Sequence, residues 1–209
     1  MEYTNKFILE ACKNRIRAEM KGLNAIIGQV DDAYAQAVRA ILECKGRVII
    51  TGLGKTGHVG KKIAASMASL GIPSFFVHSC ESLHGDMGMI CKEDLVIMIS
   101  NSGKSQEILN MIPSLNIIGA KTISITSSKK CPLAQQTYIS IQADAGPEID
   151  HLGLAPTSSS TAALVIGDAL ATVACEIKGF TRQDFALSHP AGALGQQLIK
   201  EYEQAVQAK

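Results

Sequence analysis

Residues 95–107 read LVIMISNSGKSQE. The first five are an unbroken apolar run, which is typical of a strand buried on both faces of a parallel sheet. Small hydroxyl residues and one glycine follow, and from Ile108 onward the apolar residues recur every three or four positions, which indicates a helix. A buried strand, a hydroxyl-rich loop and a helix form the arrangement in which backbone N–H groups at a helix start bind phosphate.

An ordinary strand-to-helix loop with a serine N-cap is the alternative, because such loops favour Ser and Asn for their own hydrogen bonds. Three serines, one asparagine and one glycine in a single loop favour the phosphate site. The candidate phosphate-binding residues of this loop are Ser100, Asn101, Ser102 and Ser105.

Outward from this loop, apolar runs alternate with helical patterns, which predicts an α/β fold with a mostly parallel sheet covered by helices on both faces. The expected strands are 48–51, 73–77, 95–100, 122–126 and 138–141. The expected helices are 2–21, 31–44, 59–70, 105–117, 157–177 and one beginning near Leu194, with Gly22 ending or interrupting the first and Pro113 breaking the fourth. We expect one domain over 1–209, made of N-terminal helices (1–45), an α/β core (46–180) and a C-terminal loop and helix (181–209).

Composition excludes several classes of function. The 209 residues carry a formal net charge of +1, and four tyrosines, five phenylalanines and no tryptophan give little base-stacking surface, so nucleic acid is not an expected partner. No uninterrupted apolar run reaches the length of a bilayer span, and residues 1–6 lack the apolar core of a signal peptide. We therefore expect no membrane association and a cytoplasmic location.

The six cysteines form no C-x-x-C pair, which speaks against a zinc finger and a secreted disulfide framework. We expect reduced thiols that pack as small core residues, with Cys80 the most exposed because its neighbours are polar.

Residues 52–57, GLGKTG, match the dinucleotide-binding pattern G-x-G-x-x-G after a strand. The pattern is weak here, because the acid expected to bind the ribose about 20 residues later is represented only by Glu81, within a longer loop. The alternative is that Lys55 and Thr56 reach a phosphorylated ligand from this turn.

Four more groups of residues are candidates for chemistry. His78 and His84 share a loop with Glu81 and Asp86, which is typical either of a divalent-metal site or of ordinary surface histidines.

Glu107, at the start of a predicted helix, is either a helix cap or a functional carboxylate. Glu148 lies in a partly apolar loop, where a raised pKa would make it a base near neutral pH. His189 precedes Pro190, which holds the backbone extended and presents the imidazole from a fixed position. Each is individually explained by a structural role, but together they favour a catalytic site.

Six segments carry a resemblance to a known family: GLGKTGH (52–58), FFVH (75–78), HGDMG (84–88), ISNSG (99–103), LGLAPTSS (152–159) and FALSHP (185–190). From about residue 35 to 198 the chain resembles the sugar isomerase (SIS) domain family, and within it the D-arabinose 5-phosphate isomerases. The resemblance implies a three-layer αβα sandwich around a five-stranded parallel sheet, assembled into dimers or tetramers whose active sites draw on neighbouring subunits. It implies interconversion of D-arabinose 5-phosphate and D-ribulose 5-phosphate without a redox cofactor.

The resemblance also assigns residues. Lys55, Glu107, Glu148 and His189 fall on catalytic positions, His84 on a substrate contact and His78 on a zinc position of uncertain role. Aldose–ketose isomerisation passes through an enediol and needs a base, an acid that opens the sugar ring, and positive charge near the developing oxyanion. We expect Glu148 to be the base, His189 to be the acid or base that opens the ring, and Lys55 to supply the positive charge. Glu107 is expected to orient sugar hydroxyls or Lys55. The expected substrate and phosphate contacts are Gly54, Thr56, Ser100, Asn101, Ser102, Ser105, Thr157 and Ser158.

The chain also departs from the family pattern. Lys104 stands where the loop more often carries an acid, and residues 148–151 differ from the usual sequence after the glutamate. Many members continue into a pair of CBS domains, whereas this sequence stops at Lys209, as a natural stand-alone form or as a truncated piece. Two alternatives to the pentose phosphate isomerase stay open: an isomerase of another sugar phosphate, and a sugar-phosphate-binding regulator without catalysis.

Overall fold

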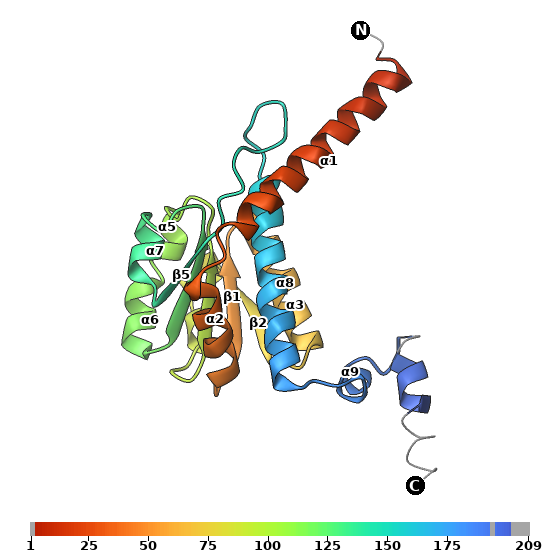
Figure 1. The fold of residues 1–209 in the computed structure, drawn as a ribbon. Coiled ribbons are helices and arrows are strands. Elements are labelled where there is room, and N and C mark those ends of the chain that lie inside the picture. Colours follow the sequence, from red (N-terminus) through yellow and green to blue (C-terminus); the bar gives the residue numbers. More distant parts are fainter. Residues whose placement is uncertain (1–2, 193–194, 202–209) are drawn as a thin grey trace.

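From Val48 onward short strands alternate with helices, and the strands form one sheet (Figure 1). This computed structural model describes residues 3–192 and 195–201. All neighbouring strands are parallel, in the spatial order β2-β1-β3-β4-β5. The order reverses between β1 and β3, and ligands of such sheets bind outside the carboxyl ends of the strands at that switch point. The strands are β1 (Val48–Gly52), β2 (Ser74–His78), β3 (Leu95–Ile99), β4 (Lys121–Thr126) and β5 (Ile139–Gln142).

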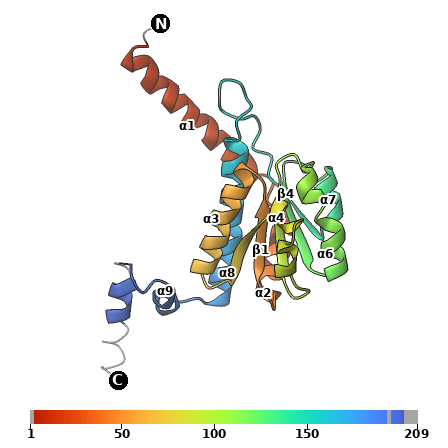
Figure 2. The ribbon, with the colours of Figure 1, turned by 180° about the vertical axis from the view of Figure 1, so that it is seen from behind.

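Helices cover both faces of the sheet, so the predicted three-layer αβα architecture is confirmed (Figures 1 and 2). One face is covered by α2 (Asp32–Glu43), α3 (Lys55–Ser69) and α8 (Ser158–Lys178), and the other by α5 (Gln106–Leu109), α6 (Ile112–Ile118) and α7 (Pro132–Gln136). The remaining elements are α1 (Asn5–Ile27), which packs on α8 and projects beyond the sheet, α4 (Ser79–Ser82), the 3₁₀ helix η1 (Asp86–Met89) and α9 (Arg182–Ser188).

The apolar run that opens the decisive stretch forms β3, the central strand. Leu95, Ile97 and Ile99 point into the core beneath α2, α3 and α8, whereas Val96 and Met98 point into the core beneath α5, α6 and α7. All five side chains are buried. A strand covered on both faces needs apolar residues at every position, which is why the run is continuous rather than alternating.

Gly22 neither ends nor interrupts the first helix, so that prediction is wrong. The helix continues to Ile27 because Gly22 is a packing position: a Cβ there would lie 2.9 Å from the carbonyl oxygen of Ala145. The predicted break before Pro113 is confirmed, since the helical segment is divided into α5 and α6 and the proline lies in the first turn of α6.

Helices α3 and α8 pack closely against each other. At Gly167 of α8 a Cβ would lie 2.4 Å from Cδ1 of Ile63 on α3, so only glycine allows this approach. Among the described residues α8 is the one helix that is long and apolar enough to cross a membrane, with a mean hydropathy of 1.5. It nevertheless contacts α1, α2 and α3 and buries nine of its residues, as the inner helix of a folded core does.

The chain after α8 extends away from the sheet (Figures 1 and 2). The segment expected to be a turn, 180–185, contains the start of α9, which Thr181 and Asp184 cap reciprocally. Residues 195–201 are helical, whereas the expected start of this last helix at Leu194 lies outside the described residues. All six cysteines are free, but Cys80 is only half-buried and the exposed thiols belong to Cys12 and Cys91.

Candidate active site

Two loops flank the switch point of the sheet. The loop after β1 leads into α3, whose first residue is the exposed Lys55, and the loop after β3 leads into α5, whose first turn holds Glu107. Because β1 and β3 are hydrogen-bonded neighbours, the topology brings Lys55 and Glu107 to the same edge of the sheet, where ligands of such folds bind in a crevice.

The turn after β1 is shorter than the glycine pattern predicted, because the helix begins at Lys55 instead of Val59. Gly54 adopts φ +56°, and a Cβ at Gly52 would lie 2.9 Å from the backbone of Thr56, so strand and helix approach closely. The Thr56 hydroxyl donates to the Leu53 carbonyl (2.8 Å) and accepts from the Leu53 N–H (3.2 Å). Thr56 therefore closes this turn. Among the described residues no side chain caps the N-terminus of α3, which leaves its N–H groups free for an anion.

The serine-rich loop after β3 is held by its own hydrogen bonds. Ser100 is buried, and its Oγ accepts from the Gly103 N–H (3.2 Å) and lies 3.1 Å from Oγ of Ser105. Gly103 adopts φ +62°, and a Cβ there would lie 2.1 Å from Sγ of Cys131 on the neighbouring segment. The loop is thus preorganised before any ligand binds.

The outer residues of this loop, Asn101, Ser102 and Lys104, are exposed, and Ser102 Oγ accepts from the Lys104 N–H. The expected long helix behind the loop is only the single turn α5. A single turn has a small dipole, so hydroxyls and loop N–H groups, rather than a helix macrodipole, are the groups available for phosphate.

Glu148, in the long loop after β5, lies against the N-terminus of α8. Its Oε2 accepts from the Thr157 N–H (2.7 Å), the Thr157 hydroxyl (2.9 Å) and the Ser159 N–H (3.3 Å). Burial raises the pKa of Glu148, but the hydrogen bonds from Ser159 and Thr157 together outweigh burial and leave the pKa below its usual value. The predicted raised pKa is therefore wrong: the carboxylate is stabilised as an anion.

The same contacts change the expectation for Thr157 and Ser158. The Glu148 carboxylate takes the place at the α8 N-terminus that was expected for phosphate, and the Thr157 hydroxyl also accepts from the Ile149 N–H. Ser158 is buried, and its hydroxyl has no hydrogen-bond partner in the part of the chain that the structure describes.

His189 lies far from the other candidates. Its Nε2 is 2.8 Å from the hydroxyl of Ser69, the last residue of α3. Its Nδ1 is 2.9 Å from the carbonyl oxygen of Phe185, and the Phe185 ring stacks on the imidazole. Lys55 begins the same 15-residue helix, so its length places the imidazole about 20 Å from the crevice. A single copy of the chain does not bring His189 to Lys55 and Glu107.

The histidines after β2 have separate surroundings. His78 ends β2 and its Nδ1 accepts from the Cys80 N–H, which caps α4, while His84 is exposed between α4 and η1. Within residues 3–192 and 195–201 no three His, Cys, Asp or Glu side chains gather as a metal would require, so the residues of one chain do not fit the zinc site.

Two acidic residues stood outside the sequence-based candidates. Asp150 accepts from the N–H groups of Leu152, Leu154 and Ala155 and so shapes the loop that carries Glu148; its position before His151-Leu152-Gly153 was a possible turn signal. Glu19 of α1 lies near the α8 N-terminus and carries no local sequence signal, because only tertiary packing places it there.

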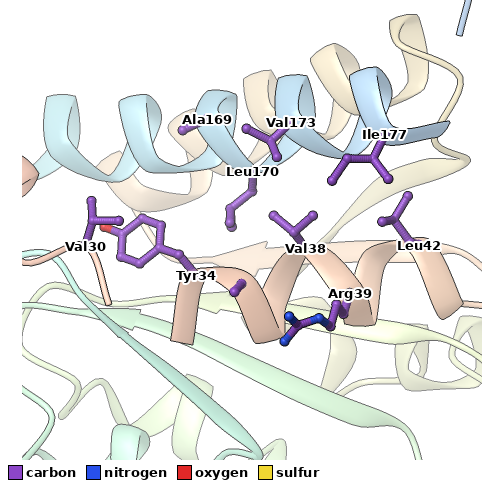
Figure 3. Close-up of a pocket in the computed structure, with 10 residues that line it drawn as sticks. Val30, Tyr34, Val38, Arg39, Leu42, Ala169, Leu170, Val173 and Ile177 are labelled. Carbon is purple, nitrogen blue, oxygen red and sulfur yellow. The ribbon is translucent and has the colours of Figure 1, made fainter. Parts of the chain in front are cut away.

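A large apolar cavity lies elsewhere. It has a volume of about 540 Å³ and lies between α2 and α8 (Figure 3). Its lining contains one charged residue, Arg39, which points away from the helix interface in the close-up. Apolar side chains from Val30, Val38, Leu42, Val173 and Ile177 dominate the rest. The cavity offers an apolar surface but none of the candidate acid–base residues.

Known proteins resemble this chain over most of its length. The family model described as SIS domain matches residues 41–173. The arabinose 5-phosphate isomerase KdsD of Pseudomonas aeruginosa is 45% identical over 95% of this chain and 61% of its own length. The protein of the same name from Escherichia coli K12 is 44% identical over 91% of this chain and 58% of its own length. The chain thus spans about three fifths of the curated relatives it matches.

Among solved structures, the one of Escherichia coli CFT073 c3406 in complex with arabinose 5-phosphate superposes with a TM-score of 0.88. The sequence identity is 42%, and the match covers 90% of this chain and 100% of that one.

Proposed function

The chain belongs to the SIS domain family, and we propose that it is an isomerase that interconverts D-arabinose 5-phosphate and D-ribulose 5-phosphate. The observation that carries this proposal is the placement of Lys55 and Glu107 directly after the adjacent strands β1 and β3 at the switch point, beside a preorganised serine-rich loop. Relatives named arabinose 5-phosphate isomerase and a neighbouring structure with that sugar phosphate bound support the choice of substrate.

In the proposed reaction the serine-rich loop and the uncapped N-terminus of α3 hold the phosphate. The Ser102 and Ser105 hydroxyls, the Asn101 amide and loop N–H groups supply donors, and Gly54 leaves the backbone open to the ligand. Ser100 supports this site from beneath, because its hydroxyl is already bonded within the loop. His84, exposed after α4, contacts the sugar.

Glu148 moves the proton. It takes a proton from C2 of the open-chain aldose and, after the enediol forms, returns it to C1, while negative charge develops on the carbonyl oxygen. A base must be ionised when the substrate arrives, and the hydrogen bonds to Thr157 and Ser159 keep Glu148 in that state. Lys55 stabilises the oxygen that gains charge, and Glu107 orients Lys55 or the sugar hydroxyls.

His189 opens the sugar ring as an acid or base, supplied by a second copy of the chain. Support comes from its place about 20 Å from Lys55 along α3, and from the α9 segment, which extends away from the sheet (Figure 2). The projecting α1 also exposes large apolar side chains, a second surface that a homodimer or homotetramer would cover: Phe7, Ile8, Leu9, Ile16 and Met20.

The proposed reaction exchanges a proton between two carbons of one molecule, so it needs no redox cofactor. Zinc enters no step, since the residues described around His78 do not form a site for it within one chain. We further propose a cytoplasmic location, which the six free thiols support, because thiols persist where the surroundings are reducing.

The test is ketose formation by the purified protein from a panel of aldose phosphates that differ at C2, C3 and chain length. We expect turnover to be fastest with D-arabinose 5-phosphate. Faster turnover of a hexose or heptose phosphate would indicate that the protein is an isomerase of another sugar phosphate on the same fold. Tight binding of a pentose phosphate without any turnover would indicate a sugar-phosphate-binding regulator.

A further inference from the structure

An apolar stripe runs along the outer face of α8. Its members recur every four residues and therefore share one side of the helix, and all four are exposed: Val165, Ala169, Val173 and Ile177. Val173 and Ile177 also line the apolar cavity between α8 and α2, so the cavity is continuous with the stripe (Figure 3). A helix face that only water covers is normally polar, so this face has the character of an interface.

Charged residues border this stripe without interrupting it. Residues 158–167, the first half of α8, carry no charge. In the second half the exposed Glu176 lies beside Ile177, and the exposed Arg39 of α2 lies at the edge of the cavity. An apolar centre with charged residues at its margin is the usual composition of a protein–protein interface.

Two exposed leucines lie at the N-terminal end of α8, in the loop that carries Glu148. Leu152 is 64% exposed and Leu154 is 75% exposed. The loop holds them in place, because the Asp150 carboxylate accepts three backbone hydrogen bonds of 2.8–2.9 Å, from both leucines and from Ala155. A loop that is ordered before binding loses little conformational entropy when a partner covers it, which favours docking.

A third exposed leucine lies beyond the C-terminal end of α8, on α9. Leu187 is 79% exposed and stands two residues before His189. Of the seven described residues of α9, Ala186 alone is buried, and the segment extends away from the sheet (Figure 2). Helix α9 therefore presents an apolar side chain next to the imidazole that the proposed reaction takes from a second copy.

The leucines at the two ends of α8 do not cover each other within one chain. The 21 residues of α8 separate them by about 30 Å. Two copies whose α8 helices lie antiparallel, stripe against stripe, bring the loop of each copy to α9 of the other. A two-fold axis forms both contacts at once, and it carries His189 of one copy toward Glu148 of the other.

We propose that two copies of this chain dock through the α8 stripe, with Leu152 and Leu154 of one copy seated against the α9 segment of the other. This docking deepens the proposed function and rests on it for the role of His189, since it names the surface that brings that imidazole to the site. A second copy fits better than an unrelated protein, because the apolar surfaces occur at both ends of one helix and a two-fold axis pairs them.

The test is cross-linking between cysteines introduced at the two ends of α8, in a protein whose exposed native thiols are removed by C12S and C91S. L154C and L187C chains are mixed in equal amounts, unfolded, refolded together and treated with a short bismaleimide. We expect cross-linked dimers in the mixture and none above background with either variant alone, because each contact joins a loop to an α9 segment.

Three results would overturn the docking. The first is a mixture without cross-links. The second is cross-linking of L154C alone, which would show that the two loops meet each other. The third is cross-linking of L154C with V173C instead of L187C, which would show that the loop occupies the cavity between α2 and α8.

The stability of the assembly gives a second readout. L154S and L187S are each expected to raise its dissociation constant at least about 100-fold, measured by sedimentation, because each substitution acts at both symmetric contacts. The control I117S removes an exposed apolar side chain from α6, on the opposite face of the sheet, and is expected to leave the constant unchanged. An unchanged constant in folded L154S and L187S would contradict the docking.

Neither measurement uses a substrate, so the docking and the proposed function fail separately. Cross-linking of L154C to L187C in a protein without isomerase activity would count against the proposed function alone. Isomerase activity in a protein that gives no cross-link would count against the docking alone.

Discussion

The carboxyl edge of the sheet and the opposite end of α3 hold their ionisable groups in different ways. At the edge, Glu148 is bound by backbone N–H groups and a hydroxyl of α8, which stabilise a charge. At the opposite end, His189 lies between the Ser69 hydroxyl and the Phe185 carbonyl and stacks on an aromatic ring. The first environment fixes an anion, whereas the second orients an imidazole.

The separation of these two regions bears on assembly. Helix α3 has 15 residues, which gives a length of about 20 Å between Lys55 and Ser69. A pentose phosphate is far shorter than this distance, so one copy of the chain does not apply both regions to one substrate. We therefore regard each chain as carrying two partial sites, one with Glu148 at the carboxyl edge of the sheet and one with His189 at the opposite end of α3.

Replacing Glu148 by glutamine is expected to have the largest effect. The change removes the proposed base while keeping the shape of the side chain, and general bases contribute about 10²- to 10⁴-fold to rates. We expect kcat for D-arabinose 5-phosphate to fall by about that factor, measured by ketose formation. The control E10Q, which removes an exposed carboxylate of α1, is expected to keep its activity. Near-normal turnover in E148Q would show that Glu148, at the carboxyl edge of the sheet, is not the catalytic base.

Mixing two inactive variants tests whether the regions act across chains. E148Q and H189A are denatured together in equal amounts and refolded, and the mixture is expected to recover about a quarter of the activity of the unmodified protein. Random pairing makes about half of the dimers mixed, and each mixed dimer combines the intact Glu148 of one chain with the intact His189 of the other at one of its two sites. Each variant refolded alone serves as the control. Mixtures no more active than those controls would place all catalytic groups within one chain and contradict the division.

Alanine substitutions at Gly103 and at Gly179 compare how tightly the serine-rich loop and the exit from α8 are packed. Both have positive φ, but a Cβ at Gly103 would collide with Cys131, whereas at Gly179 the space within 4 Å is empty. We expect G103A to lower the free energy of unfolding by about 2–4 kcal/mol and G179A by about 1 kcal/mol, measured by urea denaturation. Equal losses would show that the serine-rich loop is no better packed than the exit from α8.

The smallest expected effect is on the pH dependence of stability. The pKa of Glu148 is lower in the folded protein than in the unfolded chain, so its contribution is present above the unfolded value and is lost as the pH falls through the folded value. In E148Q the decrease in unfolding free energy between about pH 5 and 3 is expected to be shallower by less than about 1 kcal/mol, since the group is partly screened by solvent.

Asp184 has a lowered pKa as well, through its hydrogen bonds from Thr181, and remains in E148Q as an internal reference. A steeper decrease in E148Q than in the unmodified protein would contradict the contacts described for Glu148. Urea denaturation at a series of pH values provides the measurement.

Local sequence patterns predicted the sheet and the serine-rich loop because their causes are local. The continuous apolar run before Ser100 reflects burial on both faces, and the break before Pro113 follows from a missing N–H. The course of the first helix was not predictable from Gly22, because that glycine serves a contact with Ala145 more than 100 residues away.

The candidate site was predictable as a set of residues but not as an arrangement. Nothing near Glu148 in the sequence indicates that its oxygen meets Thr157 and Ser159, and the raised pKa expected from an apolar loop was wrong for that reason. The distance of His189 from the crevice likewise depends on where α9 leaves the end of α8. Contacts between segments distant in sequence decide both outcomes.

The close packing at Gly167 has a consequence for tolerance to insertions and deletions. With Ile63 lodged against it, α3 and α8 are locked side by side, and both helices begin at the candidate site. One extra residue in either helix would rotate everything beyond it by about 100° and advance it by about 1.5 Å. Length changes should therefore be rejected within these two helices, which together act as a spacer of fixed length.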